Sequence, residues 1–250
     1  MGRWILKNRL LIGLISIIMV TGLVTFGVIH YIQTSKEPSK SSVNKSNNDK
    51  NNLSDVQSSS SSNTSSGEFA SWNQRCPETL VVINRDNPLN RSMSIVNWNS
   101  SRLVNKNAKF ALGEMLDAAS KDNIFLSICS IYRTVSEQSR LFNNEVANKG
   151  GSEEAASKEV ARPGTSEHHT GLAVDFCKNG SLKDFEGSAE ANWLEKNAYK
   201  FGFILRYPVK KQDITHVINE PWHYRYVGKD YAEKIKNSGL CLEEYIKTIM

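Results

Sequence analysis

The chain has 250 residues, of which 39% are hydrophobic and 23% are charged, a balance typical of globular proteins. Its formal charge of +5 is unevenly spread: residues 1–68 carry seven Lys or Arg against four Asp or Glu, whereas residues 69–250 carry 24 against 22. The region that is able to fold is therefore almost neutral, which excludes an extended basic surface and predicts no nucleic-acid partner.

The first predicted element is a membrane-spanning helix. Leu10–Ile29 is a run of twenty residues without a charge, and a helix needs roughly 20 apolar residues to cross a hydrocarbon core of ~30 Å. Three basic residues precede the run, so the positive-inside rule places the N-terminus in the cytoplasm. The alternative is a cleaved signal peptide, whose apolar core is typically shorter. We expect residues 1–32 to form an uncleaved, single-pass anchor of a cell-membrane protein with an extracytoplasmic C-terminal domain.

The second predicted region, residues 33–68, is a disordered linker. Thirteen of its 36 residues are Ser and six are Asn. Such a segment buries too little apolar surface to offset the conformational entropy of the chain. As a flexible coil it would reach about 30–35 Å. We therefore expect a tether that holds the following domain away from the bilayer.

Residues 69–250 are expected to form one folded domain, since about 180 residues suffice for one hydrophobic core. All four cysteines lie in this region, namely Cys76, Cys129, Cys177 and Cys241. An even number of cysteines outside the cytoplasm allows two disulfides. Their spacing matches no cysteine-rich zinc motif.

The expected elements of this domain are short strands and amphipathic helices. In chain order they are a strand at 80–83, a helix at 107–120, a buried strand at 124–132, a helix capped by Ser136, a short charged helix at 152–160, a strand at 173–176, a helix at 188–200, strands at 203–205 and 222–224, and closing helices at 229–237 and 242–249. The helix at 107–120 is expected to bury Phe110, Met115, Leu116 and Ala119. This order favours an α+β fold with a small, mainly antiparallel sheet and flanking helices.

Two clusters in the sequence carry groups that bind metal ions. His168 and Asp175 lie in one stretch, with Gly171 and Ala173 between them, and Glu220-Pro221-Trp222-His223 follows about fifty residues later. A catalytic zinc is bound by three protein ligands and keeps a position open for water. His168, Asp175 and His223 supply that number of ligands, and Glu220 remains as a base for the zinc-bound water. His169 and His216 are rival ligands that residue type alone does not exclude.

The combined pattern Ser-x-His-x-x-Gly-x-Ala-x-Asp and Glu-Pro-Trp-His resembles the signature of the VanY-type D-alanyl-D-alanine carboxypeptidases. These enzymes belong to the LAS family of zinc peptidases, named for lysostaphin, the D-Ala-D-Ala metallopeptidases and sonic hedgehog. The resemblance covers nearly all of residues 76–248. Its other landmarks are Asn87-Pro88-Leu89, Ile131-Tyr132-Arg133-Thr134, Gln138, Leu141-Phe142, Arg206-Tyr207-Pro208 and the run from Glu220 to Gly228.

The resemblance implies a LAS/hedgehog-like fold in which His168, Asp175 and His223 bind Zn²⁺ and Glu220 is the catalytic base. It also implies that three further residues line the pocket for the C-terminal carboxylate of the substrate, namely Arg133, Gln138 and Ser166. Independently, an arginine at the end of a strand can pair with a carboxylate through two hydrogen bonds. Without the family resemblance, a surface salt bridge would be the simpler interpretation of Arg133.

The function implied by the resemblance is that of a zinc-dependent D,D-carboxypeptidase. Such an enzyme removes the C-terminal D-Ala from peptidoglycan stem peptides by attack of a metal-bound water. The alternatives are an L,D-carboxypeptidase acting on tetrapeptide stems, an endopeptidase, and a non-catalytic peptidoglycan-binding module of the same fold. A degenerate module usually lacks a ligand or the base, whereas all four positions are present here. We expect a monomer.

The cysteines and two departures from the family pattern complete the predictions. On its predicted strand Cys129 shares a face with Arg133, and Cys177 shares one with Asp175. If these strands pair, Cys129 and Cys177 can form a disulfide, which leaves Cys76 to pair with Cys241. The departures are His216 and Asn219, expected to alter the rim of the pocket, and the long charged segment 150–163, expected to face the substrate.

Overall fold

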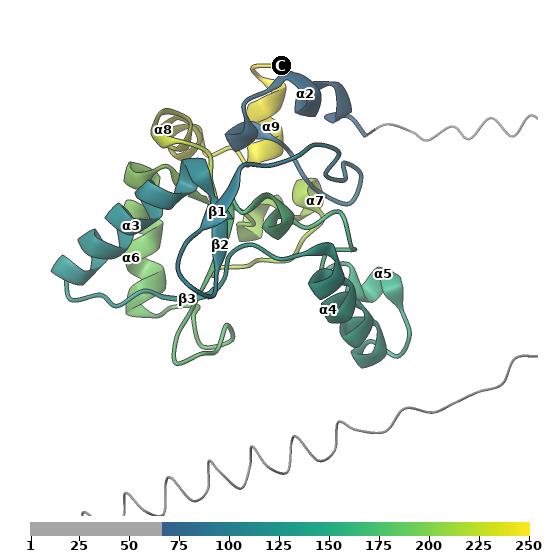
Figure 1. Cartoon of the computed structure of the whole chain (residues 1–250), viewed down its shortest axis with the longest axis horizontal. Helices are drawn as coiled ribbons and strands as arrows, with labels where there is room; N and C mark the ends of the chain where they lie inside the picture. Colours follow the sequence, from purple (N-terminus) through teal and green to yellow (C-terminus); the bar gives the residue numbers. More distant parts are fainter. Residues whose placement is uncertain (1–66) are drawn as a thin grey trace, which may run out of the picture. The chain divides into compact units, whose positions relative to one another are not determined.

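The computed structural model describes residues 67–250 (Figure 1). The predicted membrane span and nearly all of the predicted linker lie outside the described residues. Within residues 67–250, no helix combines the length and the hydropathy needed to cross a bilayer. This part of the chain has the α+β architecture predicted from the sequence, with two small antiparallel sheets and flanking helices.

The larger sheet has four antiparallel strands in the order β3-β4-β6-β5. The strands are β3 (Ser127–Ser130), β4 (Ala173–Cys177), β5 (Phe203–Leu205) and β6 (His223–Tyr226). All five residues of β4 are buried, as expected for a central strand whose side chains are apolar except for Asp175. In the pairing of β4 with β6, Asp175 lies directly opposite His223.

The smaller sheet pairs β1 (Ile95–Asn97) with β2 (Leu103–Asn105). Neither strand was predicted, because each is too short to show alternation and, unlike β5, is not wholly apolar. Asn105 ends β2 and its side chain accepts a hydrogen bond from the backbone of Asn107, which makes it the N-cap of the next helix.

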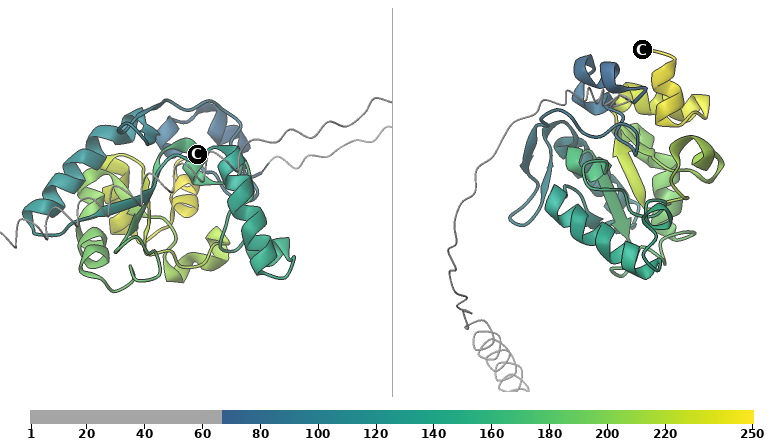
Figure 2. Two further views of the ribbon diagram at one scale, coloured as in Figure 1. Left: turned by 60° about the horizontal axis from the view of Figure 1, so that its bottom comes forward. Right: turned by 90° about the vertical axis from the view of Figure 1, so that its right-hand side faces the viewer.

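The remaining elements are helices and short 3₁₀ turns. The helices are α2 (Ala70–Arg75), α3 (Lys106–Lys121), α4 (Val135–Asn148), α5 (Glu153–Ala156), α6 (Ala189–Asn197), α7 (Gln212–Thr215), α8 (Lys229–Ser238) and α9 (Leu242–Lys247). The turns are η1 (Glu78–Leu80), η2 (Glu167–Thr170), η3 (Ala198–Phe201) and η4 (Val209–Lys211). In Figure 1, α3, α6 and α8 form one group and α4 and α5 another, while α2 and α9 lie side by side in Figures 1 and 2.

The predicted strand at 80–83 is wrong. Residues 80–83 are fully buried in the core, but they follow η1 as an extended segment that joins neither sheet. Side chains replace the missing strand partner: Asn73 both donates to the carbonyl of Val82 and accepts from its N–H. Arg225 donates to the carbonyls of Thr79 and Val81. Because these groups satisfy the buried backbone, an apolar run that resembles a strand needs no sheet.

Two predictions of burial are also wrong. The strand predicted at 124–132 shortens to β3, which lies at the edge of the sheet and alternates between exposed and half-buried residues. Phe110 on α3 is 77% exposed, whereas Met115 and Ala119 are buried. Five positions of an α-helix turn a side chain by about 140°, so Phe110 points away from the face that holds Met115.

The N-cap of α4 lies two residues earlier than predicted. Thr134, and not Ser136, is the N-cap: its hydroxyl accepts from the N–H of Glu137, whose carboxylate accepts from the N–H of Thr134. This capping box fixes the chain just after Arg133. The helix buries Phe142 but leaves Leu141 partly exposed.

The two predicted disulfides have different outcomes. Cys129 and Cys177 are bonded, as predicted, across the pair β3 and β4. Cys76 and Cys241 are buried free thiols, so their predicted pairing is wrong. That pairing followed only from elimination, which does not bring two Cα atoms within the roughly 4.4–6.8 Å that a disulfide requires. Burial raises the pKa of both thiols, that of Cys241 to about 11.

Candidate metal centre and active site

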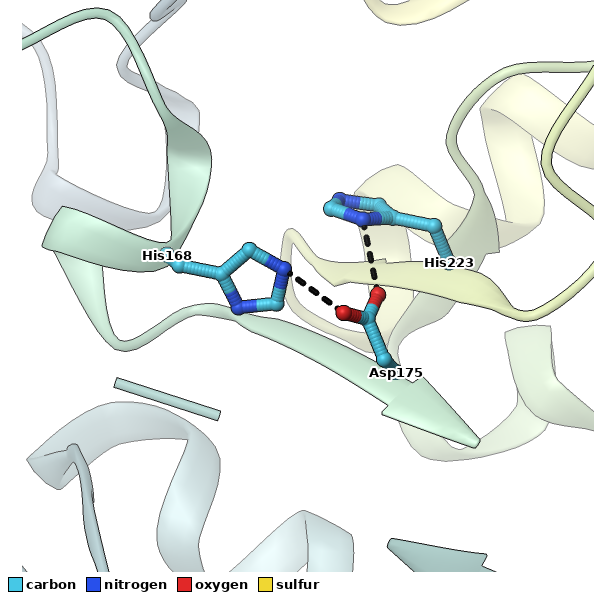
Figure 3. A group of neighbouring side chains, drawn as sticks. All are labelled: His168, Asp175 and His223. Atoms are coloured by element: carbon cyan, nitrogen blue, oxygen red, sulfur yellow. Dashed lines mark ion pairs between the residues drawn. The ribbon is translucent and has the colours of Figure 1, made fainter. Parts of the chain in front are cut away.

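The three predicted metal ligands meet at one point (Figure 3). Asp175 lies between the two imidazoles: its Oδ2 is 3.0 Å from His168 Nε2, and its Oδ1 is 3.0 Å from His223 Nδ1. The pairing of β4 with β6 creates the second contact, while His168 arrives from η2. Gly171 ends η2 in the left-handed region at φ 64°, and a Cβ there would lie 2.7 Å from the backbone nitrogen of Asn105.

The ring of His168 is oriented by the main chain. Its Nδ1 is hydrogen-bonded to the carbonyl oxygen of Ile131, which can only accept. Nδ1 therefore carries the proton, and Nε2 presents its lone pair on the side of Asp175. Burial lowers the pKa of His168. A metal ion binds the neutral form of histidine, so with Nδ1 donating to Ile131 the nitrogen that would bind the ion is Nε2.

The ring of His223 faces Asp175 with Nδ1, whereas that of His168 does so with Nε2. Burial alone would lower the pKa of His223, but its close contacts with the carboxylates of Asp175 and Glu167 raise that pKa to about 10. Burial would likewise raise the pKa of Asp175, yet its contacts with His168 and His223 hold it well below its usual range. Without a metal ion, a proton on His223 therefore balances the Asp175 carboxylate, and a bound cation would replace that proton.

The donor atoms fit a zinc ion. They lie within 4.8 Å of one another, and all three side chains are buried. With zinc–ligand distances of about 2.0–2.2 Å, two tetrahedral ligands lie roughly 3.3–3.5 Å apart. This spacing is close to the 3.0 Å between Asp175 and each imidazole nitrogen. Two imidazoles and one carboxylate are a donor set of catalytic zinc sites, which keep a further position open.

Glu220 lies beside this cluster, with its Oε2 at 3.5 Å from His223 Nδ1. A hydrogen bond from the N–H of His223 to the carbonyl of Glu220 closes the turn Glu220-Pro221-Trp222-His223. The turn brings the side chains of Glu220 and His223 close to each other. Burial raises the pKa of Glu220 to about 7. A carboxylate with such a pKa both accepts and returns a proton near neutral pH.

A cavity of about 260 Å³ includes all seven predicted site residues in its lining. They are Arg133, Gln138, Ser166, His168, Asp175, Glu220 and His223. Arg133 brings a positive charge to the edge of the metal cluster, where its Nη2 lies 3.7 Å from Asp175 Oδ2. The same nitrogen donates to Ser130 Oγ at 2.9 Å.

Gln138 and Ser166 are both buried, and their polar groups are engaged within the protein. Gln138 Oε1 accepts from Arg133 Nη1 at 2.8 Å, and its Nε2 donates to the carbonyl of Ala161 at 2.7 Å. Gln138 therefore holds the guanidinium of Arg133 in place. Ser166 Oγ accepts from the N–H of His168 at 3.3 Å, so its hydroxyl hydrogen is available to the cavity.

The rival ligands lie outside the metal cluster. His169 is engaged at both ring nitrogens: Nδ1 is 2.7 Å from the carbonyl oxygen of Arg133, and Nε2 accepts from the N–H of Gly164 at 3.1 Å. Its ring thus joins two loops. His216 is exposed and lines the cavity at its rim, as expected. The amide of Asn219 instead donates to Glu186 at 3.2 Å.

The long charged segment after α4 also lines the cavity. Residues 157–162 form one wall, in agreement with the predicted substrate-facing loop. Tyr207, to which the sequence analysis gave no role, lies on the cavity with its ring centroid 4.9 Å from that of His223.

Glu167, Arg206 and Arg225 were also given no role, although all three are fully buried beside the cluster. The sequence contains a usable signal for them. Arg206 directly follows the apolar run of β5, and Arg225 lies inside β6. A charged residue within a buried strand requires a buried partner of opposite charge.

A family model described as VanY, D-alanyl-D-alanine carboxypeptidase, matches residues 101–229. The chain belongs to this family. The matched segment contains the whole metal cluster and all of the cavity lining except Asn84 and Arg85.

Three similar proteins extend the comparison. A D-alanyl-D-alanine carboxypeptidase of Enterococcus faecalis is 40% identical over 179 residues, which cover 68% of this chain and 66% of that protein, just under two thirds of its length. A variant of the vancomycin resistance D,D-pentapeptidase VanY, solved with Zn(II), is 39% identical with a TM-score of 0.62, covering 68% of this chain and 99% of that one. The LD-carboxypeptidase LdcB is 39% identical with a TM-score of 0.60, covering 68% and 86%.

Proposed function

We propose that residues 69–250 form a zinc-dependent D,D-carboxypeptidase that removes the C-terminal D-Ala from peptidoglycan stem peptides. One observation carries the proposal: a buried His-Asp-His cluster, a carboxylate and a guanidinium line the same cavity. This set matches the needs of a hydrolase that recognises a free C-terminal carboxylate. The names of the VanY family and of its relatives in Enterococcus point to the same reaction.

The metal ligands in this proposal are His168, Asp175 and His223. Bound zinc would supply an electrophile for the scissile carbonyl and an activated water. Glu220 takes a proton from the attacking water and gives it to the leaving amine of D-Ala. Its buried position and its pKa of about 7 suit both steps. All four side chains are largely shielded from bulk solvent, although they line the cavity.

Arg133 binds the terminal carboxylate of the substrate. Its guanidinium is held by Gln138 and Ser130, so its orientation is set before the substrate arrives. The hydroxyl of Ser166 supplies a further hydrogen bond at the same end of the cavity. As a test, Arg133→Lys should raise KM for the peptide about 10–100-fold with a smaller change in kcat, since lysine provides no fork of two donors. A KM near the wild-type value would remove Arg133 from this role.

A second candidate is an L,D-carboxypeptidase acting on tetrapeptide stems. The similarity to LdcB, named an LD-carboxypeptidase, favours it, and the same metal and carboxylate chemistry serves both reactions. Purified residues 69–250 should be incubated with pentapeptide and tetrapeptide stems, and the products identified by mass spectrometry. Loss of one alanine from the pentapeptide supports the D,D reaction, and loss from the tetrapeptide alone supports the L,D reaction. Release of alanine from neither peptide would exclude a carboxypeptidase.

We further propose that Leu10–Ile29 anchors the protein in the cell membrane and that residues 33–68 tether the enzyme domain on the outer side. The support is the uncharged run of twenty residues with basic residues before it, and the Ser- and Asn-rich composition after it. The full chain should stay with membranes after alkaline carbonate extraction, and protease added to intact spheroplasts should release the domain. A soluble full-length chain would contradict the anchor.

A further inference from the structure

Glu167 is a buried carboxylate that the proposed reaction does not use. Its side chain is fully buried, and it lies one residue before the metal ligand His168. One oxygen, Oε1, accepts from Arg206 Nε at 2.8 Å and from Arg225 Nη1 at 2.7 Å. The other oxygen, Oε2, lies 3.5 Å from Nε2 of His223, the second imidazole ligand.

Because both arginines bind Oε1, the contact with His223 involves the other carboxylate oxygen, Oε2. Within the described part of the chain, Glu167 Oε2 and His223 Nε2 are both buried and neither has a hydrogen-bond partner, so their 3.5 Å contact brings together two unsatisfied polar atoms. Both arginines bind Oε1, so Oε2 is free to accept a proton donated by the ring. Because His223 faces the metal position with Nδ1, its Nε2 must carry the ring proton when a metal is bound.

The two imidazole ligands therefore have matching but chemically different supports. His168 donates its remote Nδ1–H to a backbone carbonyl, that of Ile131. His223 has no carbonyl at its remote nitrogen and meets a carboxylate instead. A histidine that binds a metal usually donates its other N–H to such a group, which fixes both the tautomer and the orientation of the ring.

Glu167 is itself held rigidly on the side away from His223. Arg206 also forms two hydrogen bonds with Glu243 of α9, at 2.8 Å and 2.6 Å. Arg225 also donates to the carbonyls of Thr79 and Val81. The carboxylate that faces His223 is thus positioned by Arg206 and Arg225, which are themselves held by α9 and by residues 79–81.

We propose that Glu167 is a positioning residue for the metal site: it accepts the Nε2 proton of His223 and so keeps Nδ1 available and correctly aimed for the metal ion. The inference rests on the proposed zinc site and goes beyond it, because it assigns the support of one ligand to a side chain outside the ligand set. Arg206 and Arg225 act one step further out, by fixing the carboxylate.

The test measures zinc affinity directly, by competition with a chromophoric chelator, in purified residues 67–250. Glu167→Asp keeps the charge that the arginines need but shortens the side chain, which withdraws the carboxylate from His223. We expect zinc to bind about 10–100-fold more weakly. Leu112→Ala is the matched control for lost stability, because Leu112 is a fully buried apolar residue of α3 that does not line the cavity. This control should bind zinc within about twofold of the wild type while unfolding at a lower denaturant concentration.

The possible outcomes distinguish a failure of the proposed zinc site from a failure of the proposed role of Glu167. If the wild-type domain binds no zinc, the proposed function itself fails. If the wild type binds zinc and folded Glu167→Asp binds it equally well, or if both variants lose the same affinity in proportion to stability, Glu167 has only a structural role.

A second measurement needs no variant at Glu167. In the zinc-loaded wild-type domain labelled with ¹⁵N-histidine, NMR should show His223 protonated at Nε2 and bound to the metal through Nδ1, with the Nε2 proton shifted downfield by a hydrogen bond. His169, which is not a proposed ligand, serves as the internal reference. A zinc-loaded His223 whose Nε2 proton exchanges freely with solvent would overturn the proposal even if Glu167→Asp failed to fold.

Discussion

Two buried clusters of ionisable side chains lie next to each other in this domain and are neutralised in different ways. The charge cluster consists of Glu167, Arg206, Arg225 and Glu243, and the metal cluster consists of His168, Asp175, Glu220 and His223. In the charge cluster two carboxylates meet two guanidiniums through hydrogen bonds of 2.6–2.8 Å. In the metal cluster two carboxylates face two imidazoles, and the guanidinium of Arg133 lies 3.7 Å from Asp175.

The balance of charge differs between the two clusters, and this difference relates to whether a cluster mainly stabilises the fold or takes part in chemistry. The charge cluster has equal numbers of opposite charges, so it needs no bound ion to be neutral and fixes the segments that supply it, while Glu167 Oε2 also contacts His223 of the metal cluster. A cluster with an excess of carboxylates must hold a proton or take up a cation, as the pKa of about 10 for His223 and of about 7 for Glu220 shows. Perturbed pKa values of this kind are typical of functional sites.

The largest effect is expected from Glu220→Gln, which changes the metal cluster without removing a ligand. Zinc should remain bound, whereas kcat on the stem peptide should fall about 10²–10⁴-fold, since the general base is lost. His223→Ala is the matched comparison and should lose zinc as well as activity. Metal content by mass spectrometry and kcat are measured on the same preparations. A kcat near that of the wild type would mean that Glu220 is not the base.

Breaking the charge cluster should instead affect stability. Glu243→Gln removes one carboxylate from Arg206 and leaves a buried guanidinium partly uncompensated. We expect the free energy of unfolding to fall by about 3–5 kcal/mol, while the folded molecules still bind zinc. Denaturant unfolding and chelator competition measure the two quantities. Loss of zinc binding without loss of stability would contradict the division between the clusters.

The disulfide Cys129–Cys177 offers a third way to alter stability near the metal cluster. It links residues 48 positions apart, and Cys177 lies two residues after Asp175. In the chain-entropy model, removing a link across such a loop costs about 4 kcal/mol of stability. The double variant Cys129→Ala, Cys177→Ala should unfold at a correspondingly lower denaturant concentration. Cys76→Ala, at a free cysteine, is the control and should depend on reductant no more than the parent does. Equal stability of the parent with and without reductant would show that the bond contributes little.

The smallest effect concerns pH in the metal-free domain. The pKa of Glu220 is about 7 in the folded chain against 4.5 in an unfolded one, and burial is the main cause. Protonated Glu220 therefore favours folding, so its contribution is fully present below pH 4.5 and is lost as pH rises through 7. Glu220→Gln lacks this loss and should be more stable than the wild type by on the order of 3 kcal/mol above about pH 8. Urea unfolding in chelator at several pH values measures the difference, and a constant difference across pH would contradict it.

The sequence by itself determined the α+β class, most helices and the chemical groups of the site. These features depend on local signals: the apolar positions within α3 and α6, and the types of residue around His168 and His223. The pair Cys129–Cys177 was also accessible, because strand alternation predicts which side chains share a face. The strands β1 and β2 were missed, because three residues are too few to show a period and neither strand is wholly apolar as β5 is.

Only the tertiary structure decided which histidines meet Asp175 and what supports them. Residue types did not separate His168 from His169, and the separation arises because η2 directs one ring to Asp175 and the other to the carbonyl of Arg133. The same holds for Glu167, whose partners come from positions 39 and 58 residues away in the chain. Contacts between distant segments depend on how the strands pair and how the helices pack, and no local pattern of residues records them.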